Sequence, residues 1–336
     1  MAKITFQQAV NQALAQEMER DERVILMGED IVGGSGSPGE MDAWGGVLGV
    51  TSGLWPRFGD RVMDTPISES AFIGAAIGAA SSGLRPVAEL MFIDFLGVCF
   101  DQVYNQAAKL RYMFGGRATT PVVIRTMIGA GLRAAAQHSQ SLYPIVTHIP
   151  GLKCVVPSTP YDAKGLLIES IRDDDPVIFC EHKMLYAMEG EVPEEPYTIP
   201  LGEANLVREG EDVTVVALGR MVHMASEAAR GLARDGIDCE IVDLRTTSPL
   251  DEETILGSVE NTGRLVVVDE SNPRCNIATD ISALVAQKAF GALRAPIQMV
   301  SAPHTPVPFS DALEDLYIPD ASSIEKAVRE VMDFQR

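Results

Sequence analysis

The stretch DTPISESAFIGAAIGAASSGLRP (residues 64–86) places one carboxylate, Glu69, at the start of a run of small apolar residues. Small residues at this density let the backbone pack very close to another group, so the acid at the start of the run is a candidate functional residue. The alternative is an ordinary helix start, in which Ser68 caps the first turn and Glu69 interacts with the positive end of the helix. Both interpretations predict a helix over residues 69–82.

Three further groups of polar residues could form sites. Glu29 and Asp30 end a predicted strand, where parallel sheets bind ligands, and a solvated turn is the alternative. His138 lies among small residues and amides in RAAAQHSQS, which suits proton transfer near neutral pH, although a structural histidine is the alternative. The acids of RDDDP (172–176) end a predicted helix and indicate either a cation site or a solvated helix terminus.

The segment GSGSPG (34–39) matches the GxGxxG pattern of dinucleotide-binding turns. Such a site needs a strand, a tight turn and a helix in direct succession. Here Pro38 lies inside the pattern and no amphipathic helix follows. The sequence therefore favours a surface or interface loop over a nucleotide site.

Short apolar runs alternate with helical patterns along the chain, and continuous apolar strands predict parallel sheets covered on both faces. Residues 189–211 interrupt this alternation with three prolines and many acids, which indicates a domain boundary. We expect an α/β protein of two doubly wound domains, residues 1–188 and 212–336, joined by a linker over 189–211. The predicted strands are 23–28, 85–92, 121–127, 152–158, 176–182, 212–219, 238–246, 264–271 and 296–303.

Composition restricts the function classes. The 336 residues are 46% hydrophobic and 22% charged, which is typical of a soluble globular protein. A net charge of −20 argues against nucleic acid or an anionic membrane as partner. The sequence shows no secretory signal, no apolar run of membrane-spanning length and no CxxC pair among its five cysteines. These features predict a cytoplasmic protein.

Read in order, the motifs GED, DTPISE, AELMFIDF, AAQHSQS and HIPGLKCVVPSTPYDAKGLL resemble the β subunits of thiamine-diphosphate-dependent dehydrogenase components of 2-oxoacid dehydrogenase complexes. The resemblance continues through SPLDEETI, DESNPRCNIATDISALV and SAPHTPVPFS, so it covers essentially the whole chain. Within the family, AWGGVLGVTSGL, HSQSLYP and DDDPVIFCEHKMLY are most similar to the acetoin dehydrogenases. The resemblance implies a transketolase-like pyrimidine-binding domain followed by a transketolase C-terminal domain.

The resemblance also implies partners. Related enzymes that bind the cofactor's diphosphate through Mg²⁺ carry a GDG motif, which this chain lacks. A separate α subunit is therefore expected to hold Mg²⁺ and the diphosphate, with thiamine diphosphate shared between the chains of an α₂β₂ heterotetramer. The implied reaction cleaves acetoin to acetaldehyde, oxidises the remaining two-carbon unit and passes it as acetyl to the lipoyl group of an acyltransferase. Pyruvate or a branched 2-oxoacid is the alternative substrate, and a non-catalytic scaffold or nucleotide-binding subunit is the alternative of another class.

The family's functional residues match positions of this sequence. By this resemblance Glu69 hydrogen-bonds N1′ of the cofactor's aminopyrimidine, Phe95 in MFIDF packs on that ring, and Glu29 lies near the cofactor. His138 matches a histidine that assists proton transfer and acylation of lipoamide. The segments PVVIR and ESIRDDDP match a potassium site, which would use Val122, Ser170, Ile171, Asp173 and Asp175.

Overall fold

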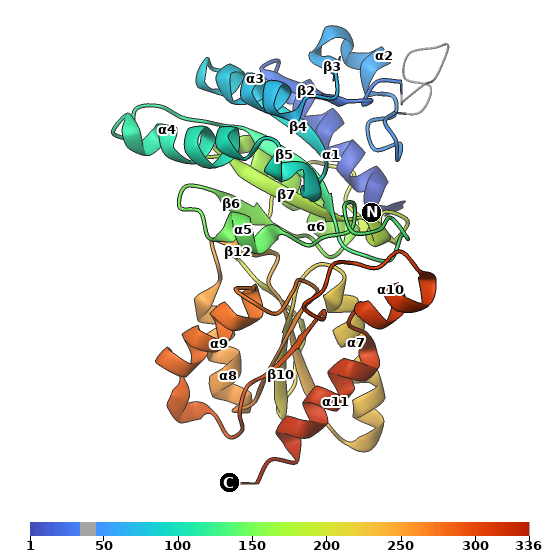
Figure 1. Ribbon diagram of the computed structural model, residues 1–336, viewed down its shortest axis with the longest axis vertical. Helices are drawn as coiled ribbons and strands as arrows, with labels where there is room; N and C mark the ends of the chain where they lie inside the picture. The colour runs from blue at the N-terminus through green and yellow to red at the C-terminus, as the bar shows by residue number, and fades with distance from the viewer. Residues whose placement is uncertain (34–44, 336) are drawn as a thin grey trace. The chain divides into compact units, whose positions relative to one another are not determined.

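The computed structural model describes residues 1–33 and 45–335 (Figure 1). The chain forms two compact units: Met1–Ile128 with Ile145–Leu201, and Gly129–Pro144 with Gly202–Arg336. The GSGSPG motif lies outside the described residues. A short segment from the middle of the chain, Gly129–Pro144, thus packs with the second unit although the sequence places it in the first domain.

The first unit is built on a parallel sheet whose strands lie in the order β6-β7-β5-β4-β2-β3. Four of these strands are buried along most of their length, as continuous apolar runs predict. Their bounds are β2 (Val24–Glu29), β3 (Val62–Thr65), β4 (Arg85–Phe92), β5 (Val123–Ile128), β6 (Lys153–Val155) and β7 (Val177–His182). A separate antiparallel pair joins β1 (Ala2–Thr5) to β8 (Glu189–Val192).

The helices of this unit begin where the sequence supplies caps. The side chains of Thr5 and Gln8 each accept a hydrogen bond from the other's backbone N–H and so start α1, while Thr159 caps α6 ahead of Pro160. The helices are α1 (Phe6–Arg20), α2 (Leu54–Phe58), α3 (Glu69–Ser81), α4 (Ala108–Met113), α5 (Tyr143–Thr147, which spans the division between the units) and α6 (Pro160–Arg172). Shorter helical turns are η1 (Gly59–Arg61), η2 (Ile93–Gly97), η3 (Gln102–Ala107) and η4 (Lys183–Leu185).

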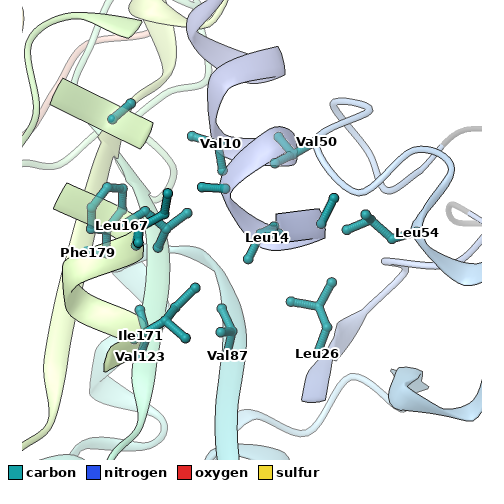
Figure 2. Packing of buried hydrophobic residues seen from close by; sticks show 14 of the residues in the cluster. Val10, Leu14, Leu26, Val50, Leu54, Val87, Val123, Leu167, Ile171 and Phe179 are labelled. Carbon is teal, nitrogen blue, oxygen red and sulfur yellow. The ribbon is translucent and has the colours of Figure 1, made fainter. Parts of the chain in front are cut away.

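The core of the first unit fills the space between helices and sheet. Figure 2 shows side chains of α1 and α6 meeting those of β2, β4, β5 and β7 in one cluster. Burial of this apolar surface is the main stabilising term, at roughly 25 cal/mol per Å². The labelled members are Val10, Leu14, Leu26, Val50, Leu54, Val87, Val123, Leu167, Ile171 and Phe179.

The second unit has its own sheet, in the order β14-β13-β10-β11-β9, and its own core. Its strands are parallel except β9, which is antiparallel to β11. The strands are β9 (Asn205–Arg208), β10 (Val213–Ala217), β11 (Cys239–Asp243), β13 (Leu265–Asp269) and β14 (Gln298–Ser301), with β12 (Thr246–Ser248) outside this sheet. The helical elements are α7 (Met221–Leu232), η5 (Ala233–Asp235), α8 (Glu252–Thr262), α9 (Ile277–Lys288), η6 (Phe290–Ala292), α10 (Asp311–Tyr317) and α11 (Ala321–Met332).

The predicted α/β class, with two largely parallel sheets, is confirmed. The segment 189–211 contributes one strand to each unit, β8 to the first and β9 to the second. Across the described part of the chain, no helix has both the length and the apolar character needed to cross a membrane.

Candidate functional site

Three of the predicted site residues of the first unit lie at the carboxyl ends of neighbouring parallel strands. Glu29 is the last residue of β2, Glu69 is the first residue of α3 after β3, and Phe95 lies in η2 directly after β4. Because β3, β2 and β4 are adjacent, these positions share the carboxyl edge of the sheet, where open α/β sheets bind ligands.

Glu69 is not part of a capped helix start. The Ser68 hydroxyl donates to the Pro66 carbonyl at 3.1 Å and makes no capping bond, so the expectation that Ser68 caps this helix is wrong. The Glu69 residue is only 9% exposed. The nearby Cys99 thiol has a pKa raised to about 12, chiefly because it is buried and secondly because of the charge of Glu69. Glu69 is therefore largely buried at the start of a helix that the Ser68 side chain does not cap.

Glu29 shares this environment. Its side chain is buried, and its Oε2 atom has no hydrogen-bond partner among the described residues. Burial first, and then the charges of Glu69, Asp30 and Glu89, raise the pKa of Glu29 above its ordinary value. The structure thus brings Glu29 and Glu69 together, and it leaves one buried carboxylate oxygen available to an external donor.

The loop that follows Glu29 is fixed from two sides. Asp64 accepts a hydrogen bond from the Val32 backbone N–H at 2.7 Å, and the Thr51 hydroxyl donates to the Ile31 carbonyl at 2.6 Å. Asp30 has a φ of 56°, in the left-handed region that non-glycine residues adopt at a cost. The position of Glu29 is therefore set by its surroundings rather than by local preference.

A buried ion cluster that the sequence analysis missed lies beside these acids. The Arg125 guanidinium on β5 donates to Glu181 at 2.7 and 2.8 Å and to Glu89 at 2.8 Å, and the Tyr186 hydroxyl donates to Glu181 at 2.7 Å. Burial raises the pKa of Glu89, while Arg125 lowers it in part. Gly28 leaves the room this needs, because a Cβ there would lie 3.0 Å from Glu89. The available signal was a charged residue inside each of three apolar strands, β4, β5 and β7.

Phe95 lies at the same edge and is held by aromatic contacts. Its ring meets that of Phe92 edge to face, with centroids 5.7 Å apart and an interplanar angle of 79°. The Lys183 ammonium in turn lies 5.1 Å from the centre of the Phe92 ring. Phe95 is partly buried and packs against the core of the first unit.

His138 lies on a loop of the second unit. Its backbone N–H donates to the Ala135 carbonyl at 3.4 Å, closing a turn. Ser139, directly after it, is 2% exposed, and its hydroxyl has no partner within the described chain. The loop that carries His138 therefore belongs to the second unit, whereas Glu29 and Glu69 belong to the first.

Of the residues predicted for potassium, Val122 directly precedes β5, Ser170 and Ile171 lie in the last turn of α6, and Asp173 and Asp175 lie between α6 and β7. They therefore lie toward the amino ends of these strands, opposite the edge that carries Glu29. There the Arg85 guanidinium donates to the carbonyls of Ile171 at 3.0 Å and Asp173 at 2.9 Å. Lys153 lies 3.7 Å from Asp175, which also accepts from Arg111 at 2.7 Å. Basic side chains thus already neutralise this loop. The Val122 carbonyl accepts from the Val177 N–H, and the Ser170 hydroxyl donates to the Leu166 carbonyl.

The carboxyl edge fits an aminopyrimidine and does not suggest a metal. The described residues contain no cluster of three or more His, Cys, Asp or Glu side chains able to hold a metal ion. An aminopyrimidine offers an N–H donor, a ring nitrogen that shares a proton with a carboxyl group, and a flat face. Glu29, Glu69 and Phe95 supply the complementary groups.

Comparison with known proteins agrees with this geometry. Residues 2–189 match the family model of the transketolase pyrimidine binding domain, and residues 202–324 match that of the transketolase C-terminal domain. A solved structure described as a split gene transketolase, inactive beta4 tetramer, has the same fold, with a TM-score of 0.78 and 21% identity over 99% of both chains. The two domains implied by the resemblance are therefore confirmed.

Curated relatives of known name span almost the whole chain. The β subunit of acetoin:2,6-dichlorophenolindophenol oxidoreductase is 70% identical in Cupriavidus necator, over 98% of both chains. The protein of the same name in Bacillus subtilis is 58% identical over 98% of this chain and 97% of the relative. The β subunit of the pyruvate dehydrogenase E1 component of Bacillus subtilis is 46% identical over 99% of this chain and all of the relative.

The fold and the matched domains define a transketolase-like α/β protein whose N-terminal domain is of the pyrimidine-binding type, which implies thiamine diphosphate as cofactor. The chain belongs to the family of thiamine-diphosphate-dependent dehydrogenase β subunits, and its similarity to the acetoin-specific branch, predicted from the motifs, is confirmed.

Replacing Glu29 with glutamine is expected to stabilise the protein at pH about 8, because a raised carboxyl pKa favours folding only while the group is protonated. That contribution is lost as the pH rises through the folded-state pKa, so the gain from Glu29→Gln should shrink as the pH falls toward ~4.5. Urea unfolding across this range measures it. Glu22→Gln, at an exposed acid, is the control. A lower midpoint for Glu29→Gln at pH about 8 would contradict the assignment.

Proposed function

We propose that this chain is the β subunit of a thiamine-diphosphate-dependent acetoin dehydrogenase. The observation that carries the proposal is the pair of buried carboxylates, Glu29 and Glu69, at the carboxyl edge of a pyrimidine-binding domain. The acetoin substrate is supported by the two oxidoreductase β subunits at 70% and 58% identity.

Bound thiamine diphosphate supplies a nucleophilic carbon that attacks a carbonyl group. The part of this chain is to hold and protonate its pyrimidine. Glu69 would hold the N1′ nitrogen of the bound pyrimidine through a shared proton. Glu29, whose pKa is raised, provides a second carboxyl group beside it, and Phe95 packs on the ring face. General acid–base groups of this kind contribute ~10²–10⁴ in rate.

His138 serves the later step of the same reaction. Its imidazole can donate or accept a proton as the acetyl group passes to a lipoyl thiol. We assign the loop that carries it to acyl transfer, and we leave binding of the pyrimidine to the first unit.

The partners follow from what the chain lacks and from its relatives' names. We propose an α subunit in an α₂β₂ assembly that holds Mg²⁺ and the cofactor's diphosphate, since this sequence has no GDG motif and its relatives are called β subunits. A lipoyl-bearing acyltransferase is the proposed acceptor. The five cysteines are free, which fits a reducing compartment such as the cytoplasm.

Substrate choice is the first test. The chain, co-expressed with its α partner and supplied with Mg²⁺ and thiamine diphosphate, is expected to reduce 2,6-dichlorophenolindophenol with acetoin and not with pyruvate or a branched 2-oxoacid. Steady-state rates with the three substrates measure this. A preference for pyruvate would move the chain to the branch of its 46% identical relative and leave the residue roles unchanged.

Glu69→Gln in this complex is expected to reduce acetoin-dependent dye reduction by ~10²–10⁴ while the fold and the assembly remain. The amide keeps the shape of the side chain but cannot exchange the proton with N1′. Stopped-time dye assays, with circular dichroism and gel filtration on the same sample, measure the effect. Glu22→Gln is the matched control. Activity that survives Glu69→Gln would favour the scaffold interpretation.

A potassium ion at the loop of Val122, Ser170, Ile171, Asp173 and Asp175 stays a prediction. Against it stand the cationic side chains that already bind these oxygens. A bound ion would raise the thermal midpoint with KCl above that with choline chloride at equal ionic strength, since a ligand of the native state stabilises it. Equal midpoints would leave Arg85, Lys153 and Arg111 as the loop's counter-ions.

A further inference from the structure

Glu314, on α10, is a buried acid that the proposed chemistry does not use. Its residue is fully buried, and both of its carboxylate oxygens face the segment that carries His138. Oε1 accepts from the Gly131 N–H at 2.7 Å, and Oε2 accepts from the Arg133 N–H at 3.1 Å and the Arg133 guanidinium at 2.7 Å. One side chain thus binds three donors of a loop about 180 residues away in the sequence.

Other acids of the second unit hold the two ends of the same loop. The Ala130 N–H donates to Glu270 at 2.8 Å, and the Tyr143 hydroxyl donates to Asp269. Both acids lie at the carboxyl end of β13 and are buried. Buried carboxylates that accept several charge-assisted hydrogen bonds fix geometry strongly. The loop is therefore anchored before, after and within the stretch that leads to His138.

The backbone of this loop is strained, so it needs such anchors. Gly129 and Gly131 have φ values of 90° and 113°, and the non-glycine residues Arg133 and Ala135 have φ values of 57° and 60°. Left-handed non-glycine residues persist only where the surroundings determine them, and they gather at functional sites. Glu314 binds the backbone N–H groups of two of these four residues.

We propose that Glu314 is a positioning residue, which holds the loop of His138 in the conformation used for acyl transfer. The proposal rests on the proposed role of His138. It makes the C-terminal unit a part of the catalytic machinery through a carboxylate that does not touch substrate or cofactor. Asp311 and Asp315 also pair with Arg133, at 3.2 and 2.6 Å, but they are exposed and bind no backbone group of the loop.

The test compares Glu314→Gln with Asp315→Asn in the assembled complex. An amide at 314 turns an N–H group toward the loop's own donors, whereas Asp315→Asn removes only an exposed ion pair of Arg133, which contributes little. We expect Glu314→Gln to speed hydrogen exchange of the amides over residues 129–135 by at least ~10-fold. The kcat of lipoamide acetylation should fall ~10-fold, while the KM for acetoin and the rate of dye reduction change less.

The hydrogen-exchange and rate measurements together distinguish the positioning role of Glu314 from the ion pair of Arg133. Asp315→Asn should leave exchange and both rates within about twofold of the unmodified complex, and an equal effect of both variants would overturn the backbone-holding role in favour of the ion pair. Unchanged exchange in Glu314→Gln would overturn the positioning role. If Glu314→Gln does not assemble, Glu314→Asp, which keeps the charge with a shorter reach, should show the same pattern more weakly.

His138→Ala separates this proposal from the one on which it rests. It should lower acetylation without loosening residues 129–135. If acetylation survives His138→Ala, the role of His138 fails, whatever Glu314→Gln does. If His138→Ala lowers acetylation and Glu314→Gln loosens the loop without lowering it, the positioning role alone is overturned.

Discussion

The pairing of Arg125 with Glu89 and Glu181 is the constraint on which the carboxyl edge of the first sheet depends. A buried charge is tolerated only when it is paired and hydrogen-bonded. Burial alone would lower the pKa of Arg125, but the charges of Glu181 and Glu89 outweigh burial and raise it. The one cation, on β5, thus pairs with two acids on the strands at either side of it, β4 and β7. No ion pair in the described chain reaches Glu29, and its buried Oε2 atom has no donor, so a ligand that brings an N–H group would complete it.

The same residue type plays opposite parts in the two units. Glu314 has every oxygen satisfied by its own chain, so it can only hold structure in place. Glu29 has an oxygen that is buried and unsatisfied, and its pKa is raised by burial and by like charges. Because native structures rarely leave buried polar atoms unpaired, the second pattern indicates a group that meets a ligand.

The sequence predicted what short-range pattern controls. The apolar runs that became β4 and β7 and the helix beginning at Glu69 were placed nearly to the residue. The two strands are largely buried, and the buried residues of the helix recur at helical spacing, so each carries a clear apolar signal. By contrast, β3 was missed because four residues with a half-exposed pattern carry no periodic signal. The hydrogen bonds of Glu314 with Gly131 and Arg133 could not be predicted either. They join residues about 180 positions apart, and such contacts follow from the fold and not from local composition.

The candidate site divides along the same line. Motif resemblance predicted roles for Glu29, Glu69, Phe95 and His138, since each lies in a stretch with its own signature, and these roles stay predictions. It could not find Arg125, which appears in the sequence only as a charge inside an apolar strand. The register makes its meaning clear: Glu89 pairs with Arg125 across β4 and β5, and with Gly28 across β2 and β4. A side chain at position 28 would push Glu89 away from the Arg125 guanidinium and leave a buried charge without its partner. The ion cluster therefore requires a glycine before Glu29. The cluster in turn affects Glu29, because the charge of Glu89 is one of the causes that raise the pKa of Glu29.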